Sequence, residues 1–294
     1  MKIKVVSNYD TDKNMFRTMK NCHENNTRLK LTEADDYDYM VVINGHRGNI
    51  NVPRENVIGI LQEPIGNINY DRNLHLYCNK IICQSRDMFR GYNGIIESPM
   101  HMFYTHHCTI ERKKFINFTD FNKRKKLCVI MSSLSHPNNT NWTNHNYQKR
   151  HSFIKKMLNT DIDFDFYGRG WRNINDIRYK GETINKHDTI RKYEYSIAIE
   201  NVCEKNYASE KLFDCFLNNT VPFYYGCPNV DEIYDPKSYI IIDIEDSDTI
   251  SKIREEIKKD NLFYKDSVLK SKEIYFNKLN IFNLINENIN EYCH

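Results

Sequence analysis

The feature that most constrains this chain is a regular alternation of short apolar runs with longer amphipathic stretches. Apolar runs at 3–6, 39–43, 56–61 and 80–84 are bounded by Asn, Gly, Pro and Asp, which break regular structure. Short, continuous apolar runs of this kind are typical of strands buried on both faces. Such strands belong to parallel sheets that carry helices on both sides.

The same alternation continues to the end of the chain. It predicts strands at 126–133, 163–168, 195–201, 221–225 and 239–243, and helices at 147–158, 209–218, 248–259 and along most of 262–292. A chain of 294 residues, 40% of them hydrophobic, is long enough for two domains with real cores. We therefore expect an α/β protein of two Rossmann-like domains that face each other across a ligand-binding cleft.

A charged stretch at 111–126 with scattered apolar positions predicts the linker between these domains. We place the first domain at 1–122 and the second at 123–275, and we expect a C-terminal helix over 276–294 to pack back on the first. The basic cluster at 122–126 also fits a nucleic-acid contact, but the net charge is only +3. A solvated linker is the better interpretation, and we predict no nucleic-acid partner.

The nine cysteines give no disulfide or metal pattern, because their number is odd and no C-x-x-C occurs. Several lie inside apolar runs, where a thiol behaves as a small hydrophobe, so we expect reduced thiols rather than disulfides. No run approaches the roughly 18 apolar residues of a membrane span, and the N-terminus lacks a signal-peptide core. We expect a soluble, cytoplasmic protein of undetermined oligomeric state without a transmembrane segment.

Polar residues gather where the strand at 195–199 ends and the helix at 209–218 begins. Glu200 and Asn201 follow the strand, at the edge where ligands of parallel sheets bind. Ser209 is the expected N-cap of the helix. Lys211 in the first turn opposes the helix dipole, and a bound diphosphate would explain its position. Glu210 is suited to accept hydrogen bonds from sugar or ribose hydroxyls; the alternative is that both residues are simply solvated.

The segment 195–230 resembles the motif of the α-1,3-fucosyltransferases, glycosyltransferase family 10. The matching positions are Glu200-Asn201, Tyr207, Glu210-Lys211, Val221-Pro222 and Gly226. Ser209 replaces the usual Thr and keeps the hydroxyl. The resemblance extends over about 126–245 and is weak in the N-terminal part, as expected where acceptors differ.

The resemblance implies a GT-B fold whose C-terminal domain binds GDP-fucose and inverts the anomeric centre without a metal. Arg150 would pair with the diphosphate, Lys211 would hold the same phosphates, and Glu210 would contact the ribose. Together these cations would stabilise the leaving diphosphate in place of a metal. The expected partners are then a nucleotide-sugar donor and a glycan acceptor, with no cofactor.

The resemblance also implies a donor pocket lined by Asn201, Tyr207 and Glu200. The Tyr167-Gly168-Arg169 sequence resembles the strand-to-loop turn of the family, so Gly168 joins the candidate donor-binding residues.

Inversion requires a general base near the acceptor hydroxyl, and the family places a Glu just after an N-terminal-domain strand. Glu63, in the strand end Gln62-Glu63-Pro64, is our candidate; the alternative is a strand-end carboxylate in solvent. Glu97, in a Glu-Ser-Pro string, resembles the base motif of animal members but comes too late in chain order.

Other constellations are weaker. Several D-x-D strings, among them Asp36/Asp38, Asp161/Asp163, Asp163/Asp165 and Asp246/Asp248, would suit a metal-dependent GT-A enzyme. We instead read 163–168 as a strand with Ile162, Phe164 and Phe166 on its buried face. A cluster of His101, His106, His107 and Cys108 has no paired motif for zinc, and we interpret it as surface or interdomain residues.

Two functional alternatives stay open. The first keeps the fold with another donor such as UDP-xylose, because the resemblance fixes the diphosphate contacts better than those to the base or the sugar. The second is a non-catalytic carbohydrate- or nucleotide-binding module, which the absence of a general base would favour.

Overall fold

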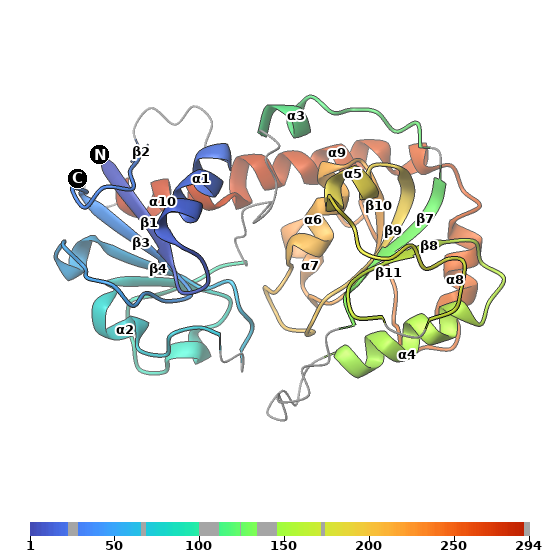
Figure 1. Ribbon diagram of the computed structural model, residues 1–294, viewed down its shortest axis with the longest axis horizontal. Helices are drawn as coiled ribbons and strands as arrows, with labels where there is room; N and C mark the ends of the chain where they lie inside the picture. Colours follow the sequence, from blue (N-terminus) through green and yellow to red (C-terminus); the bar gives the residue numbers. More distant parts are fainter. Residues whose placement is uncertain are drawn as a thin grey trace. The chain divides into compact units, whose positions relative to one another are not determined.

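In the computed structural model the chain forms two compact units, each built on its own sheet (Figure 1). Unit 1 comprises Met1–Phe115, Lys205–Tyr207 and Tyr275–His294, and unit 2 comprises Ile116–Glu204 and Ala208–Ile274. The structure describes residues 1–22, 29–65, 69–99, 112–123, 125–133, 146–171 and 174–290, without the side chains of 21, 22, 112, 113 and 290. The predicted cluster of His101, His106, His107 and Cys108 lies outside the described residues.

Unit 1 contains a six-stranded sheet in the order β2-β1-β3-β4-β5-β6, with all neighbouring strands parallel. Its strands are β1 (Lys2–Ser7), β2 (Lys30–Leu31), β3 (Tyr39–Ile43), β4 (Val57–Ile60), β5 (Lys80–Cys83) and β6 (Ile95–Glu97). Its helical elements are α1 (Asp12–Cys22), η1 (Arg54–Asn56), α2 (Leu74–Tyr77), η2 (Arg86–Phe89), the π-helical turn η4 (Tyr275–Leu279) and α10 (Ile281–Asn290). The four strands expected from the apolar runs are present.

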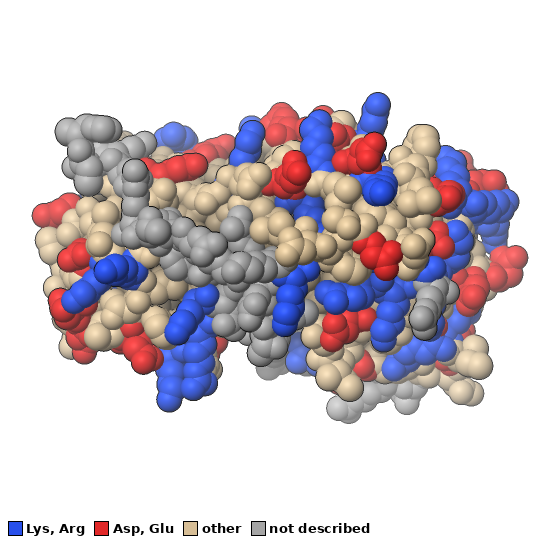
Figure 2. All heavy atoms as spheres, turned by 90° about the horizontal axis from the view of Figure 1, so that it is seen from above, with Lys and Arg blue, Asp and Glu red and all other residues tan. Residues whose placement is uncertain are grey.

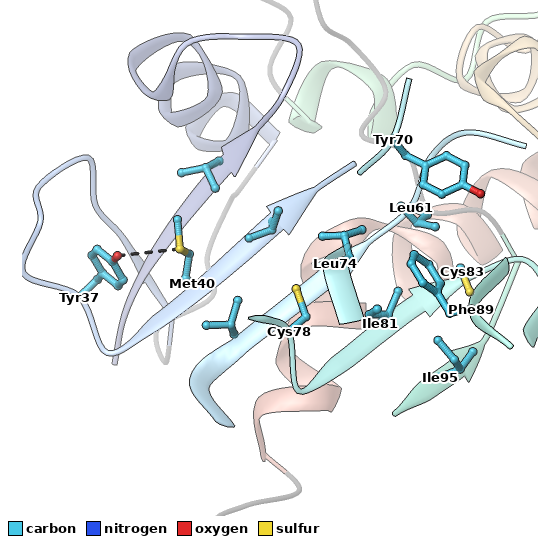
Figure 3. Close-up of a cluster of buried hydrophobic side chains, with 13 residues drawn as sticks. Tyr37, Met40, Leu61, Tyr70, Leu74, Cys78, Ile81, Cys83, Phe89 and Ile95 are labelled. Carbon is cyan, nitrogen blue, oxygen red and sulfur yellow. Dashed lines mark hydrogen bonds between the residues drawn. The ribbon is translucent and has the colours of Figure 1, made fainter. Parts of the chain in front are cut away.

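The core of unit 1 combines strand residues with α2 and the turns around it (Figure 3). Leu74 and Cys78 are fully buried beside Ile81 of β5. Gly59 in β4 leaves room for this packing, since a Cβ there would lie 3.2 Å from the Cys78 sulfur. The apolar character of β3, β4 and β5 thus follows from their burial, as expected for a parallel sheet.

The C-terminal helix α10 belongs to unit 1. The Lys80 ammonium donates to the carbonyl of Asn288 at 3.5 Å. A cavity of about 450 Å³ lies here and is lined by residues from the start of β5, from β6 and from Leu284 and Glu287 of α10. The helix therefore closes on the sheet of unit 1 along its β6 edge.

Unit 2 contains a five-stranded, all-parallel sheet in the order β11-β10-β9-β7-β8. Its strands are β7 (Lys125–Ile130), β8 (Asp165–Tyr167), β9 (Tyr193–Ile199), β10 (Val221–Tyr225) and β11 (Ile240–Ile241). Helix α3 (Arg112–Ile116) lies at the end of the first segment of unit 1, and only its last residue belongs to unit 2. The helical elements of unit 2 are α4 (Tyr147–Leu158), α5 (Lys186–Ile190), α6 (Glu210–Leu217), α7 (Val230–Ile233), α8 (Thr249–Glu256), η3 (Asn261–Tyr264) and α9 (Lys265–Ile274).

The predicted elements of unit 2 are present, with some boundaries shortened. The strand expected at 163–168 covers only Asp165–Tyr167, although Ile162, Phe164 and Phe166 are buried as predicted. The strand expected at 239–243 is reduced to Ile240–Ile241, because it pairs with β10 alone at the edge of the sheet.

The predicted solvated linker at 111–126 contains ordered elements, and within its basic end Lys123 departs from the prediction while Lys125 and Lys126 are exposed. Residues 112–116 form α3, and β7 already begins at Lys125. The Lys123 ammonium is not solvated, since it donates to the carbonyls of Arg191 at 2.8 Å and Asn218 at 2.7 Å. Backbone carbonyls from distant segments thus accept the hydrogen bonds of a lysine that the sequence predicts to be at the surface.

The molecular surface agrees with the nearly balanced composition. On the face seen in Figure 2, basic and acidic side chains are interspersed. No helix within the described residues is both long enough and apolar enough to cross a bilayer. The six cysteines whose side chains the structure describes, Cys78, Cys83, Cys128, Cys203, Cys215 and Cys227, are free thiols.

Candidate functional site

The candidate site lies at the carboxyl edge of the sheet in unit 2, where β9 ends. Glu200 and Asn201 follow β9 directly. The N-terminus of α6 and that of α4 are both attached to these two residues. Because parallel strands present their carboxyl ends on one edge, this is the place where an α/β unit binds ligands.

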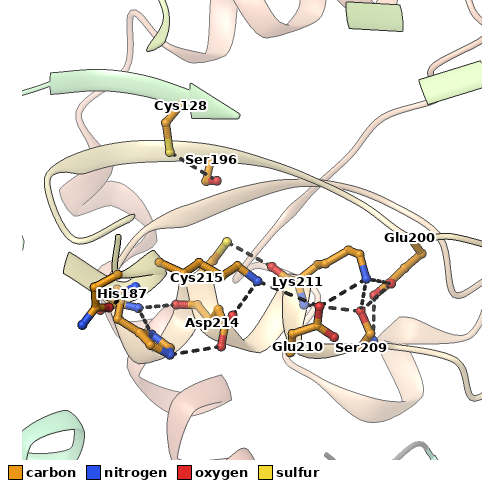
Figure 4. Close-up of polar contacts among 12 residues, drawn as sticks. Cys128, His187, Ser196, Glu200, Ser209, Glu210, Lys211, Asp214 and Cys215 are labelled. Carbon is orange, nitrogen blue, oxygen red and sulfur yellow. Dashed lines mark hydrogen bonds and ion pairs between the residues drawn. The ribbon is translucent and has the colours of Figure 1, made fainter. Parts of the chain in front are cut away.

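Glu200 is the centre of the site and is completely buried. Its Oε1 accepts the backbone N–H of Ser209 at 2.6 Å, and its Oε2 accepts the Ser209 hydroxyl at 2.6 Å (Figure 4). The Lys211 ammonium lies 3.5 Å from Oε2. Burial raises the pKa of Glu200, although Lys211 and the bonds from Ser209 work in the opposite direction. The Glu200 carboxylate therefore binds Ser209 and Lys211 and has no surface exposed to solvent.

The first turn of α6 is built around Ser209 and Lys211. Ser209 is the N-cap as predicted, and its hydroxyl accepts the backbone N–H of Lys211. The Lys211 ammonium donates to the Ser209 hydroxyl at 2.9 Å and to Glu210 Oε1 at 3.3 Å. A first-turn lysine that opposes the helix dipole is thus held by two carboxylates and a hydroxyl, rather than extending into solvent.

A second lysine continues this network along α6. Lys186, the first residue of α5, has its ammonium 4.0 Å from Glu210 Oε1 and 2.6 Å from Asp214 Oδ2. Asp214 is 1% exposed, and His187 Nε2 lies 3.7 Å from its other oxygen. Neither Lys186 nor Asp214 is recognisable from the sequence as a site residue, because only a spatial contact connects α5 with α6.

Arg150 of α4 reaches the same loop from the other side. Its Nη1 donates to Asn201 Oδ1 at 2.5 Å, and its Nε donates to the Met131 sulfur at 3.0 Å. The N-cap residue of α4, Asn146, donates its backbone N–H to the Asn201 carbonyl at 2.7 Å and its side-chain amide to the Glu200 carbonyl at 3.2 Å. Arg150 and Lys211 are therefore tied to two consecutive residues.

Two glycines permit this close arrangement. A Cβ on Gly226, at the end of β10, would lie 2.3 Å from Glu200 Cγ. Gly168, after β8, has φ +148°, and a Cβ there would lie 1.8 Å from the carbonyl oxygen of Met131. Since Met131 also contacts Arg150 through its sulfur, Gly168 supports the site through Met131.

Two of the predicted site residues belong to unit 1. Tyr207 is 3% exposed and lies in the segment Lys205–Tyr207, where Asn206 donates its side-chain amide to the Gln84 carbonyl at 3.0 Å. Glu63 is half-buried just after β4. The preceding residue, Gln62, is fixed by its N–H bond to the Asn44 side chain at 2.8 Å.

Glu97, the alternative general base, and Asp165 of the D-x-D strings both have partners within the protein. Glu97 ends β6, and its Oε2 accepts the backbone N–H of Arg86 at 3.2 Å. Asp165 of the D-x-D strings accepts the Tyr193 hydroxyl at 2.6 Å and pairs with Lys180 at 3.3 Å. Over the described parts of the chain, no three His, Cys, Asp or Glu side chains are grouped to hold a metal ion.

Solved structures with a similar fold are glycosyltransferases. A crystal structure of an α1,3-fucosyltransferase with GDP-fucose matches with a TM-score of 0.54 and 17% identity, covering 91% of this chain and 81% of that chain. Staphylococcus aureus TarM, solved in a complex that includes UDP, matches with a TM-score of 0.54 and 12% identity over 85% of this chain and 55% of that one. Two parallel-sheet units of this kind define the GT-B class of glycosyltransferase folds.

The sequence comparisons specify the family. The profile of glycosyltransferase family 10 (fucosyltransferase), C-terminal part, matches residues 122–268, half of the chain. The α-(1,3)-fucosyltransferase FucT of Helicobacter pylori is 26% identical over 129 residues, and a fucosyltransferase-like protein of Arabidopsis thaliana is 27% identical over 105 residues. The chain belongs to glycosyltransferase family 10. Its matches cover 40% and 36% of this chain, but only 24% and 19% of those relatives.

Proposed function

We propose that this protein is an inverting, metal-independent glycosyltransferase that moves L-fucose from GDP-fucose to a hydroxyl of a carbohydrate acceptor. Unit 2 is the donor-binding half, and unit 1 supplies the general base and the acceptor contacts. The observation that carries the proposal is the attachment of two cations, Arg150 and Lys211, to the consecutive residues Asn201 and Glu200.

The donor diphosphate binds at the N-terminus of α6. The helix dipole favours an anion there, and Lys211 in the first turn adds a full charge. Arg150 adds a planar guanidinium that suits phosphate oxygens. Glu210 follows the N-cap and accepts hydrogen bonds from the ribose.

In the reaction the acceptor oxygen attacks C1 of fucose while the bond from C1 to the diphosphate oxygen breaks. GDP leaves with the electron pair of that bond, and the two cations stabilise its developing charge. The acceptor proton passes to Glu63, the general base. A single displacement of this kind inverts the configuration at C1.

A donor panel tests the proposal. GDP-fucose, GDP-mannose, UDP-xylose and UDP-glucose are each added to the protein with and without EDTA, and the melting temperature is measured. A ligand that binds the native state raises stability by about 2.7 kcal/mol at 100 times its Kd. We expect GDP-fucose to give the largest shift and EDTA to leave it unchanged. A shift with a UDP-sugar and none with GDP-fucose would reject the donor, and loss of the shift in EDTA would reject metal independence.

The cations are tested one at a time in the same assay. Arg150→Ala and Lys211→Ala should each weaken GDP binding at least about tenfold, because each removes a charge-assisted bond to phosphate. Lys149→Ala is the matched control: Lys149 precedes Arg150 and pairs with Glu245 at 2.6 Å on the surface. Wild-type affinity in both site variants would refute the phosphate assignment.

The base is tested by transfer activity. Glu63→Gln should abolish fucose transfer while donor binding persists, whereas Glu97→Gln should retain activity. The opposite pattern would assign the base to Glu97.

A further inference from the structure

We propose that Lys186 is a positioning residue of the donor site, which holds the Glu210 carboxylate in place for the ribose hydroxyls of the nucleotide. This inference rests on the proposed function, since it assigns the ribose contact to Glu210. Lys186 lies outside the motif on which the family resemblance is based.

The geometry places one carboxylate oxygen between two ammonium groups. Glu210 Oε1 lies 3.3 Å from Lys211 Nζ and 4.0 Å from Lys186 Nζ. The two lysines come from different helices, α6 and α5. When a diphosphate takes hydrogen bonds from Lys211, Lys186 remains as the cation beside Glu210, so the carboxylate keeps its orientation as the donor binds.

Lys186 is itself held rigidly. Its ammonium lies 2.6 Å from Asp214 Oδ2, and the Asp214 side chain is 2% exposed. The pKa of Lys186 is raised because Asp214 and Glu210 outweigh the effect of its burial. A charged, anchored side chain loses little conformational entropy when it acts on a neighbour.

The charges in this network alternate along α6. The series runs through Glu200, Lys211, Glu210, Lys186 and Asp214, so three carboxylates face two ammonium groups. His187 faces the other oxygen of Asp214 at 3.7 Å, and its Nδ1 is 2.8 Å from the side-chain amide of Asn218. Lys186 is thus the cation that Glu210 and Asp214 share.

The competing explanation is that Lys186 only neutralises buried Asp214. Removing one partner of a buried pair is strongly destabilising, so Lys186→Met alone cannot distinguish the two roles. The informative comparison is between Asp214→Asn and the double variant Lys186→Met/Asp214→Asn. Neither leaves an unpaired buried carboxylate at 214, and the double variant has the same net charge as the wild type.

The experiment measures dissociation constants for GDP and for inorganic pyrophosphate by calorimetry, together with melting temperatures. We expect the double variant to bind GDP about fivefold more weakly than Asp214→Asn, the effect of roughly one charged contact. Its affinity for pyrophosphate, which lacks a ribose, should change by less than about twofold. Lys186→Arg in the Asp214→Asn background should restore GDP binding, and Lys258→Met, a surface lysine paired with Glu255 at 2.7 Å, should match the wild type.

Several results would overturn the inference. Equal GDP affinity in Asp214→Asn and the double variant would leave Lys186 with a structural role only. Equal weakening of GDP and pyrophosphate would mean that it acts through net charge and not through Glu210. If the wild type bound neither ligand, the proposed function would fail, which is distinct from either of these results.

Discussion

At the scale of single residues, the site depends on a buried carboxylate. Glu200 is 0% exposed, yet it accepts two bonds from Ser209 and lies beside Lys211. Buried charge is tolerated only where hydrogen bonds and counter-charges compensate for lost hydration. Glu200 thus fixes the N-terminus of α6 and the ammonium of Lys211. Gly226 leaves the space that the Glu200 side chain occupies.

The first prediction concerns Gly226. Gly226→Ala would place a methyl group 2.3 Å from Glu200 Cγ and 2.9 Å from the Tyr224 hydroxyl oxygen. We expect a loss of stability of about 1–3 kcal/mol from overpacking, with weaker GDP binding because Glu200 must shift. Urea unfolding and calorimetry measure the two effects.

Gly91→Ala is the control for Gly226. Gly91 has φ +81°, and no described atom lies within 4 Å of an added Cβ, so its cost is backbone strain of about 1–2 kcal/mol. It should lower stability without changing GDP affinity. Unchanged GDP affinity in Gly226→Ala would show that the packing around Glu200 does not influence the site.

At the scale of elements, α6 is the helix on which the site is built. Ser209 caps it and also donates to Glu200. Six of the eight residues from Glu210 to Leu217 are buried, so the helix is anchored in the core while its N-terminus carries the polar network. Its first turn is therefore a rigid support for Lys211.

The second prediction concerns this cap. Ser209→Ala should destabilise the protein by about 1–2 kcal/mol, because the N-cap bond is lost and Glu200 loses one of its donors. Ser209→Thr keeps the hydroxyl, so it should cost less. Denaturant midpoints compare the two, and an equal loss in both variants would contradict a role for the hydroxyl.

Elements with strong local signals were predictable, and those defined by distant contacts were not. The helix at Tyr147–Leu158 and the strands at Tyr39–Ile43 and Val221–Tyr225 were predicted with their observed boundaries, because apolar spacing and flanking residues specify them. Helix α1 was missed, since its buried Met15 and Met19 are surrounded by polar residues.

The candidate site shows the same division. The cap at Ser209 is local and was predicted from sequence. The pairing of Lys186 with Asp214 depends on how α5 packs against α6. Outside the site, Lys272 is likewise buried against a distant group, the carbonyl of Phe118 154 residues away. No local pattern encodes contacts of this kind.

At the scale of the whole molecule, the chain passes between the two units at residues 115/116, around 205–207 and at 274/275. Within unit 2, Lys272 of α9 connects the segment that follows the crossing at 115/116 with the segment that precedes the crossing at 274/275. Its ammonium donates to the Phe118 carbonyl at 2.7 Å and to Asn219 Oδ1 at 3.1 Å. Burial, together with Lys123 and Arg191, lowers the pKa of Lys272 to about 7.

The third prediction is a pH dependence of stability from Lys272. Because its folded-state pKa lies below the unfolded value, the unfolded state binds more protons, so the free energy of unfolding rises as pH rises through about 7. Between pH 7 and 8 this contributes about 1 kcal/mol. Urea unfolding should show the wild type gaining this amount relative to Lys272→Met, and a constant difference between the two across this range would contradict the prediction.

The assembly of unit 1 from separate stretches of sequence has a consequence for building chimaeras. Unit 1 is assembled from three stretches of sequence, and Lys80 bonds to Asn288 across two of them. A chimaera that exchanged only residues 1–115 with a homologue would leave α10 and Lys205–Tyr207 facing a foreign sheet. A chimaera that keeps unit 1 whole therefore carries the tail helix and that three-residue segment along with the amino-terminal portion.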